Sequence, residues 1–331
     1  MGRGGVVEVL AVAGLYVAGV IGAGFASGQE IVVFFLHYGW GGFAGTLLTL
    51  VLLSSTVVVV LEFCSHQGIT SYEDLFPILG GRCAPFFDWI YSLFLLIGMS
   101  VMLAGSATLG APYRFVTALL VFLVLQKGVR AVLEIGSPLA LILVVVLGLI
   151  SLSQLRTRPP VLPETGSWRG LEAALLYSSY NLGFSMALLA SVHHVLTSSK
   201  QRWAVSLLGN LILGLLLALL FFALGTLTPK QLADPLPAQH LAYNFGRNGL
   251  LVYKLMIWLA MYTTTLANAL ALVTRITIKG KVSWVWVSLL VLVGAILLSY
   301  VGFGTLIRVA YPLLGLGGLW LLANLLRIRF L

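Results

Sequence analysis

The chain has 331 residues, of which 60% are hydrophobic and only 9% are charged, and its mean hydropathy is +1.05. Soluble domains carry a charge on about 25% of their residues, so this composition excludes a soluble protein and indicates a polytopic protein of the lipid bilayer. The formal net charge of +9 does not indicate nucleic-acid binding, because the basic residues are scattered through short loops rather than gathered on one face.

The first apolar stretch, from about Val6 to His37, is long enough to span a membrane and is rich in glycine. Its central glycines are Gly14, Gly19, Gly22, Gly24 and Gly28. Each interior glycine costs a helix about 0.8–1 kcal/mol relative to alanine, so we expect the helix to unwind between Gly22 and Gly24. Ser27 and Glu30 have the spacing of a capping box, which predicts that a second half-helix starts there. The alternative is that Gly24 and Gly28 form a GxxxG motif for close helix packing.

The later apolar stretches complete an all-α protein with ten expected transmembrane helices. After the first, the expected crossings are 41–64, 85–109, 113–126, 131–155, 171–196, 203–227, 250–276, 282–300 and 304–325. A polar connector with prolines, 156–168, separates two halves of similar size. Lysine and arginine are more numerous in the loops on the side of the N-terminus, which predicts that both termini are cytoplasmic.

The sixth expected crossing is also unusual, because a polar run with a glycine, Tyr177 to Gly183, lies at its centre. Its place in the second half corresponds to that of the first crossing in the first half. Interrupted helices at matching positions indicate a transporter site at the interface of two repeats, since a broken helix at membrane depth must line a protein cavity. We therefore expect helices one and six to be broken, and 1–160 and 161–331 to be inverted five-helix repeats.

The segment GVIGAGFASGQE, residues 19–30, resembles the signature of the YkvI-type family of bacterial membrane proteins, distant relatives of the amino acid–polyamine–organocation superfamily. The resemblance implies a LeuT-like fold of ten helices in two inverted repeats, with a substrate held between the broken first and sixth helices. It also implies a multi-pass protein of the bacterial inner membrane.

The unwound first helix is expected to present free N–H groups of Phe25, Ala26 and Ser27, which suit an anionic group such as a carboxylate. The resemblance places the carboxylate of an amino acid at the same break. On the sixth helix, Tyr180 and Asn181 are candidate side-chain contacts, Asn181 because an amide both donates and accepts, although tyrosine hydroxyls also serve to join helices. The expected substrate-binding residues are Gly22, Ala23, Gly24, Phe25, Ala26, Ser27, Tyr180 and Asn181.

The eighth crossing carries the run from Ala260 to Thr265, in which positions 260, 263 and 264 share one helical face. Uncharged oxygen ligands suit a sodium ion, and this pattern resembles the conserved sodium site of LeuT-like symporters. With the first-helix carbonyls that the resemblance adds, the expected sodium ligands are Ala18, Ile21, Ala260, Thr263 and Thr264. The alternative is that the threonines bond back to carbonyls of their own helix.

The alternative coupling ion is a proton. Proton-coupled relatives carry a lysine in the fifth helix, and residues 131–155 contain none, which favours sodium. Glu30, a carboxylate at membrane depth, keeps proton coupling open.

Glu30 and Arg308 are expected in the outer halves of the first and tenth crossings. Opposite charges at similar depth in lipid pair or face water, so the two residues are candidates for a gate that latches the helices above the substrate. The alternative is that Glu30 only completes its capping box and Arg308 reaches outward to water.

These features predict a sodium-driven symporter for a small organic solute that works by alternating access, and the expected solute is an amino acid or related amine. The sequence also leaves open a proton-coupled transporter of the same fold and a membrane ligand sensor that does not transport. No enzyme and no cofactor are expected, because the sequence offers no nucleophile paired with a base and no cofactor motif. The oligomeric state is not specified by the sequence.

Overall fold

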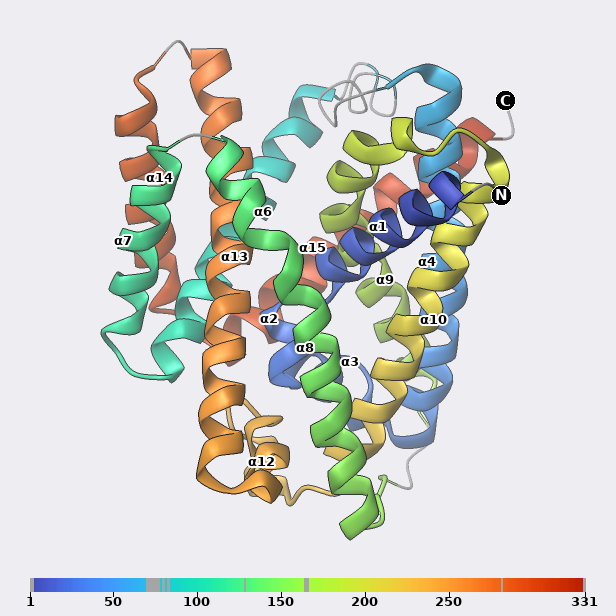
Figure 1. Cartoon of the computed structure of the whole chain (residues 1–331), viewed down its shortest axis with the longest axis vertical. Coiled ribbons are helices and arrows are strands. Elements are labelled where there is room, and N and C mark those ends of the chain that lie inside the picture. Colours follow the sequence, from blue (N-terminus) through green and yellow to red (C-terminus); the bar gives the residue numbers. More distant parts are fainter. Residues whose placement is uncertain are drawn as a thin grey trace.

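The computed structural model of the chain describes residues 3–69, 78, 81, 84–127, 129–163, 167–280 and 282–329, and these form helices joined by short connections (Figure 1). In this described part, six helical segments are long and apolar enough to span a membrane, and four shorter apolar helices accompany them. Both chain termini lie near one end of the bundle in Figure 1, which we call the terminal end. The opposite end carries α12 (Gln239–Ala242) and is called the lid end.

The first crossing is broken, as predicted, but the break lies at Ile21 and Gly22, and Ala23 and Gly24, which were expected to be unwound, are helical. It consists of α1 (Arg3–Val20), α2 (Ala23–Ser27) and α3 (Gln29–Phe34), and it ends in the short helix η1 (Leu36–Tyr38). The chain leaves helical geometry at Gly22, whose backbone is extended, and changes direction again at Gly28, whose φ of 80° favours glycine. Figure 1 shows the resulting shape, with α1 running obliquely across the bundle.

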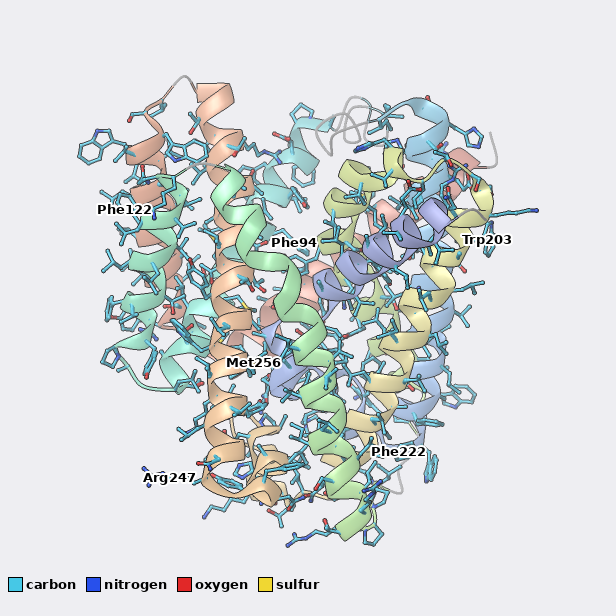
Figure 2. The ribbon with its side chains drawn as sticks, in the orientation of Figure 1. Phe94, Phe122, Trp203, Phe222, Arg247 and Met256 are labelled. Carbon is cyan, nitrogen blue, oxygen red and sulfur yellow. The ribbon has the colours of Figure 1, made fainter. Side chains whose placement is uncertain are left out.

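The remaining long helices follow the expected crossings closely. They are α4 (Gly39–Gln67), α6 (Ala84–Thr108), α7 (Tyr113–Leu125), α8 (Val129–Thr157), α9 (Arg169–Val192), α10 (Ser199–Leu224), α13 (Gly246–Gly280), α14 (Trp284–Ser299) and α15 (Phe303–Arg329). Helix α9 packs against α1 and α15, and α6 packs against α15 and α2, so the first, third, sixth and tenth crossings surround one interior region. In Figure 2, Phe94 of α6 lies within the bundle, whereas Trp203 and Arg247 project from its surface.

The predicted break in the sixth crossing is wrong. Helix α9 is continuous from Arg169 to Val192, and a 3₁₀ turn follows it at His193–Val195. The short polar side chains at its centre bond within the helix: Ser178 donates to the carbonyl of Ala174 at 2.8 Å and Asn181 donates to that of Tyr177 at 3.0 Å. Short polar side chains that bond back to their own helix leave no need for the backbone to open.

The connection from α10 to α13 folds back into the bundle as a lid. It contains α11 (Pro229–Leu232), α12 and the short helix η4 (Tyr243–Phe245). The backbone N–H of Ala238 donates to the carbonyl of Ser27 at 2.8 Å, and Leu236, Ala238 and Leu241 are buried. The lid therefore contacts the first crossing at the junction between α2 and α3.

Candidate functional site

The carboxylate of Glu30 occupies the break in the first crossing. Glu30 belongs to α3, but the turn at Gly28 directs its side chain back toward α2. There it lies against Gly24, and a methyl group at Gly24 would come within 2.8 Å of the Glu30 carboxyl carbon. The absence of a side chain at Gly24 thus creates the space that the carboxylate fills.

Helix α9 supplies the polar partner of this carboxylate. The hydroxyl of Tyr180 donates to Oε2 of Glu30 at 2.7 Å. The hydroxyl of Tyr177 lies near the same carboxylate, is buried, and meets no partner at hydrogen-bond geometry. Residues from the first and sixth crossings therefore meet at one point, as the sequence predicted, although the meeting does not require a break in the sixth.

Glu30 is 4% exposed, and in the part of the chain that the structure describes no basic side chain pairs with it. Moving an ionised side chain to the centre of a bilayer costs about 3 kcal/mol on insertion scales and over 10 in simulations of isolated helices. One hydrogen bond to a charged group contributes only about 1.5–3 kcal/mol, so Tyr180 offsets that cost at best in part. The site consequently favours a proton or a bound cation on Glu30.

Aromatic rings surround Glu30 and Tyr180. The ring of Tyr180 lies 5.2 Å from that of Tyr177 and 4.8 Å from that of Tyr311 on α15. Phe34, from the same short helix as Glu30, lies 5.6 Å from Tyr180. Aromatic faces attract cations, so an anionic group set among them is suited to an organic ammonium ion.

Toward the terminal end, the aromatic cluster borders an apolar pocket between α6, α9 and α15. Phe94 lines this pocket together with Gly183 and Gly318. Its ring lies 4.2 Å from that of Phe184, which in turn lies 6.2 Å from that of Tyr180. The site is thus covered by the lid on one side and separated from the pocket by aromatic rings on the other.

The substrate-binding residues predicted on the first crossing do lie at the break, but their free N–H groups differ from those expected. Because α2 starts at Ala23, its first N–H groups are those of Ala23, Gly24 and Phe25, whereas Ala26 already donates to the carbonyl of Gly22 at 3.0 Å. The expectation of free N–H groups at Ala26 and Ser27 is therefore wrong. Asn181 is buried and bonded within α9, so its amide nitrogen is engaged in the helix.

The predicted capping box is also wrong. Gly28, not Ser27, precedes α3, and the side chain of Glu30 contacts Tyr180 instead of reaching back to cap the helix. The hydroxyl of Ser27 donates to the carbonyl of Gly24 at 2.7 Å and accepts from the N–H of Gln29 at 3.1 Å. Ser27 therefore stabilises the turn between α2 and α3.

The two halves of the predicted sodium site lie on helices that have no extensive contact with each other. Helix α13, with Ala260 and Thr264, packs against α2, α6 and α8, whereas α1, with Ala18, packs chiefly against α8, α9 and α10. The hydroxyl of Thr263 donates to carbonyls of its own helix, at 3.0 Å to Leu259 and 3.2 Å to Ala260. Ile21, the other expected ligand, lies at the break that follows α1.

The predicted gate between Glu30 and Arg308 is not formed. Glu30 turns inward to Gly24 and Tyr180, whereas the side chain of Arg308 is exposed. An arginine near the end of a crossing keeps its charge solvated by reaching outward, which is the alternative that the sequence left open. The structure thus corrects the partner of Glu30 from a base to a phenol.

Two contributors to the site were not predicted. Tyr311 of α15 completes the aromatic cluster, and Tyr253 of α13 donates to the carbonyl of Ala26 at 3.1 Å, which fixes α2. Neither residue stands in a motif. Tyr311 does precede Pro312 in an otherwise apolar helix, which is too general a feature to identify it.

Comparison with known proteins places the chain among relatives of the same length. No family model matches it. It is 30% identical over 319 residues to the uncharacterized membrane protein YkvI of Bacillus subtilis (strain 168), an alignment that covers 91% of this chain and 90% of YkvI. The chain belongs to the YkvI family. YyaD, an uncharacterized protein of the same organism, is 27% identical over 323 residues, with 94% of each chain covered.

The fold of this YkvI-family protein matches that of a solved membrane-protein structure. It superposes with a TM-score of 0.64 and 12% identity on Mhp1, a nucleobase-cation-symport-1 family transporter in a closed conformation with bromovinylhydantoin bound. The match covers 92% of this chain and 74% of Mhp1. The predicted LeuT-like helical fold is therefore confirmed.

Proposed function

We propose that this YkvI-family protein is a secondary active transporter of the bacterial cell membrane that moves a small organic solute by alternating access. The observation that carries the proposal is the buried carboxylate of Glu30 at the break of the first crossing, in contact with Tyr180 of the sixth. Broken helices at membrane depth are where transporters of this architecture bind their substrates. The repeats 1–160 and 161–331 are the units that would move about this site.

The proposed substrate is an amino acid or a related amine, as expected for a distant relative of the amino acid–polyamine–organocation superfamily. Its ammonium group would lie at Glu30, within the aromatic cluster. A substrate carboxylate would accept hydrogen bonds from the first N–H groups of α2, those of Ala23, Gly24 and Phe25. This assignment gives each charged group of an amino acid a partner of opposite polarity at the break.

Sodium is the proposed coupling ion, bound between Ala18 and Ile21 on one side and Ala260, Thr263 and Thr264 on the other. Formation of this site requires α1 to approach α13, which gives the ion a preference for one conformation. A transmembrane potential of 100 mV supplies about 2.3 kcal/mol per charge, enough to concentrate a solute tens of fold with one sodium ion.

Proton coupling is the second candidate, and a specific observation favours it. Glu30 is a carboxyl group at membrane depth without a basic partner in the described ranges, while the Thr263 hydroxyl is engaged in its own helix.

In the proposed orientation the terminal end is cytoplasmic and the lid end is outside, so that both termini of the multi-pass chain are in the cytoplasm. The lysine and arginine distribution supports this orientation. The lid over Ser27 would then restrict access from outside in this conformation.

The experiment is a thermal-shift screen of the purified chain against amino acids, amines and small carboxylates, each in sodium and in potassium. Binding stabilises in proportion to RT ln(1 + [L]/Kd), so one screen identifies both the ligand and its ion. A ligand found in this way is then tested for uptake into proteoliposomes under a sodium or a proton gradient. Uptake that exceeds equilibration supports the proposal, whereas binding without any transport would identify a sensor and refute it.

A further inference from the structure

We propose that Glu30 holds a proton in the substrate-free protein and exchanges it for the ammonium group of the substrate, so that the two compete for one carboxylate. This inference rests on the proposed transport function and specifies how its central site is occupied. It assigns to the site a ligand class, organic ammonium ions, and a sense of proton movement opposite to that of a proton symporter.

The Glu30 carboxylate must serve both occupants, the proton and the ammonium group. Glu30 is the charged residue at the break, and Tyr180 is its hydrogen-bond donor at 2.7 Å. The Tyr180 phenol offers one hydroxyl, which leaves the second carboxylate oxygen to a proton or to an ammonium N–H. The proton and the ammonium group each neutralise the charge of Glu30. Once one of them is bound, the carboxylate no longer attracts the other.

Among the described residues, no other titratable side chain at the site is suited to carry the negative charge that pairs with an ammonium group. The titratable side chains that face Glu30 are Tyr177 and Tyr180 of α9 and Tyr311 of α15, with Tyr16 of α1 beyond them. Phenols at this depth stay protonated at neutral pH. His37 and the exposed Arg308 lie near each other outside the aromatic cluster.

Hydrogen-bonding capacity beside the Glu30 carboxylate is unused. The hydroxyl of Tyr177 is fully buried and has no hydrogen-bond partner at ordinary geometry. Buried hydroxyls normally have a hydrogen-bond partner, so an unpaired buried hydroxyl at a candidate site indicates that a ligand supplies the partner. An ammonium ion at Glu30 would also place an additional N–H donor beside Tyr177, whose oxygen can accept.

The exchange balances in protons and charge. The substrate R–NH₃⁺ approaches the Glu30 carboxylic acid, the O–H bond of the acid breaks, and the proton leaves to water on the side that is open. The ammonium ion then forms an ion pair with the resulting carboxylate. The site is neutral before and after, so the charge in the membrane does not change in this step.

Infrared difference spectroscopy on the purified full chain tests the exchange directly, because a protonated carboxyl group has its own C=O stretching band. Two matched triads serve as probes: L-alanine with ethylammonium and propionate, and L-leucine with 3-methylbutylammonium and 4-methylpentanoate. Within each triad the compounds differ by loss of the carboxylate or loss of the amine. Glu30→Gln removes the carboxyl group under test. Glu172→Gln removes an exposed carboxylate on α9 and is the matched control.

We expect at least one amine of these triads to remove the carboxyl band in the parent and in Glu172→Gln, and neither anion to do so. In Glu30→Gln the band change should disappear and amine affinity should fall at least tenfold. The proposal is overturned if an amine binds while the band persists, if the same change appears in Glu30→Gln, or if no amine binds and an anion does.

If none of the six compounds binds to the parent protein, the proposal is also overturned. Failure of the proposed function gives a different result: an amine that displaces the proton but is not taken up by proteoliposomes leaves the exchange at Glu30 intact and removes transport.

Discussion

A single methyl group at Gly24 should displace the carboxylate on which the site depends. An added Cβ at this position would lie 2.8 Å from the carboxyl carbon of Glu30 and 3.1 Å from its Cγ, both too close for van der Waals contact. Because the obstacle is the end of a flexible side chain, Glu30 moves and the backbone stays. Gly24→Ala should therefore break the hydrogen bond from Tyr180 without unfolding the protein.

The expected size follows from the contact that is lost. Leaving a buried polar group without its partner costs about 1–3 kcal/mol, which corresponds to a loss of roughly 5- to 150-fold in affinity for a ligand bound at Glu30. The assay is ligand titration by thermal shift or calorimetry, with the ligand found in the screen. Helix propensity favours alanine by about 0.8–1 kcal/mol and offsets part of this cost, so the unliganded mutant should lose at most about 2 kcal/mol of stability.

Gly14→Ala is the matched control, because Gly14 lies on α1 away from the break and a Cβ there meets no atom within 4 Å. It should bind the ligand as the parent does. Equal losses in both variants, or no loss in Gly24→Ala, would refute the role assigned to the space at Gly24.

Tyr180→Phe keeps the ring and removes the donor to Glu30, so ligand affinity should change by roughly 5- to 150-fold while the fold persists; an unchanged affinity would exclude this hydroxyl from the site. Thr264→Ala should abolish stabilisation by sodium, whereas Thr265→Ala, whose hydroxyl is bonded to its own helix, should not; a normal sodium response in Thr264→Ala places the ion elsewhere. Ala238→Pro suits the local φ of −66° but removes the N–H that seals Ser27, so ligand release should be roughly two- to tenfold faster, and an unchanged rate would show that the lid is not the exit barrier.

The positions of the long helices could be predicted because the lengths of apolar stretches are set by the bilayer and not by tertiary contacts. The break in the first crossing could be predicted because Gly22 and Gly24 weaken a helix locally. The prediction for the sixth crossing was wrong because a run of serine and asparagine is compatible with both a broken and a continuous helix. In α9 the hydroxyls and the Asn181 amide bond back to the preceding turn, and the sequence does not show which way such side chains turn.

The partner of Glu30 could not be predicted for a different reason. Spacing along a helix places Glu30 away from Gly24, and only the left-handed turn at Gly28 brings the two together. The identity of the third participant, Tyr180, depends on how α9 packs against α3, which is a tertiary property. A residue pair created by a turn is visible in a sequence only when the turn is known.

The two interpretations of the glycine pair each explain one glycine. A Cβ at Gly28 would lie 3.0 Å from Leu224 of α10 and 3.4 Å from Ala238 of the lid, so this glycine does permit close packing, as a GxxxG motif requires. Gly24 instead makes room for a carboxylate of its own chain. Close packing at Gly28 fixes the direction of α3, and that direction delivers Glu30 to Gly24. The packing and binding interpretations are therefore successive steps of one structure, and a substitution at either glycine should disturb the same carboxylate.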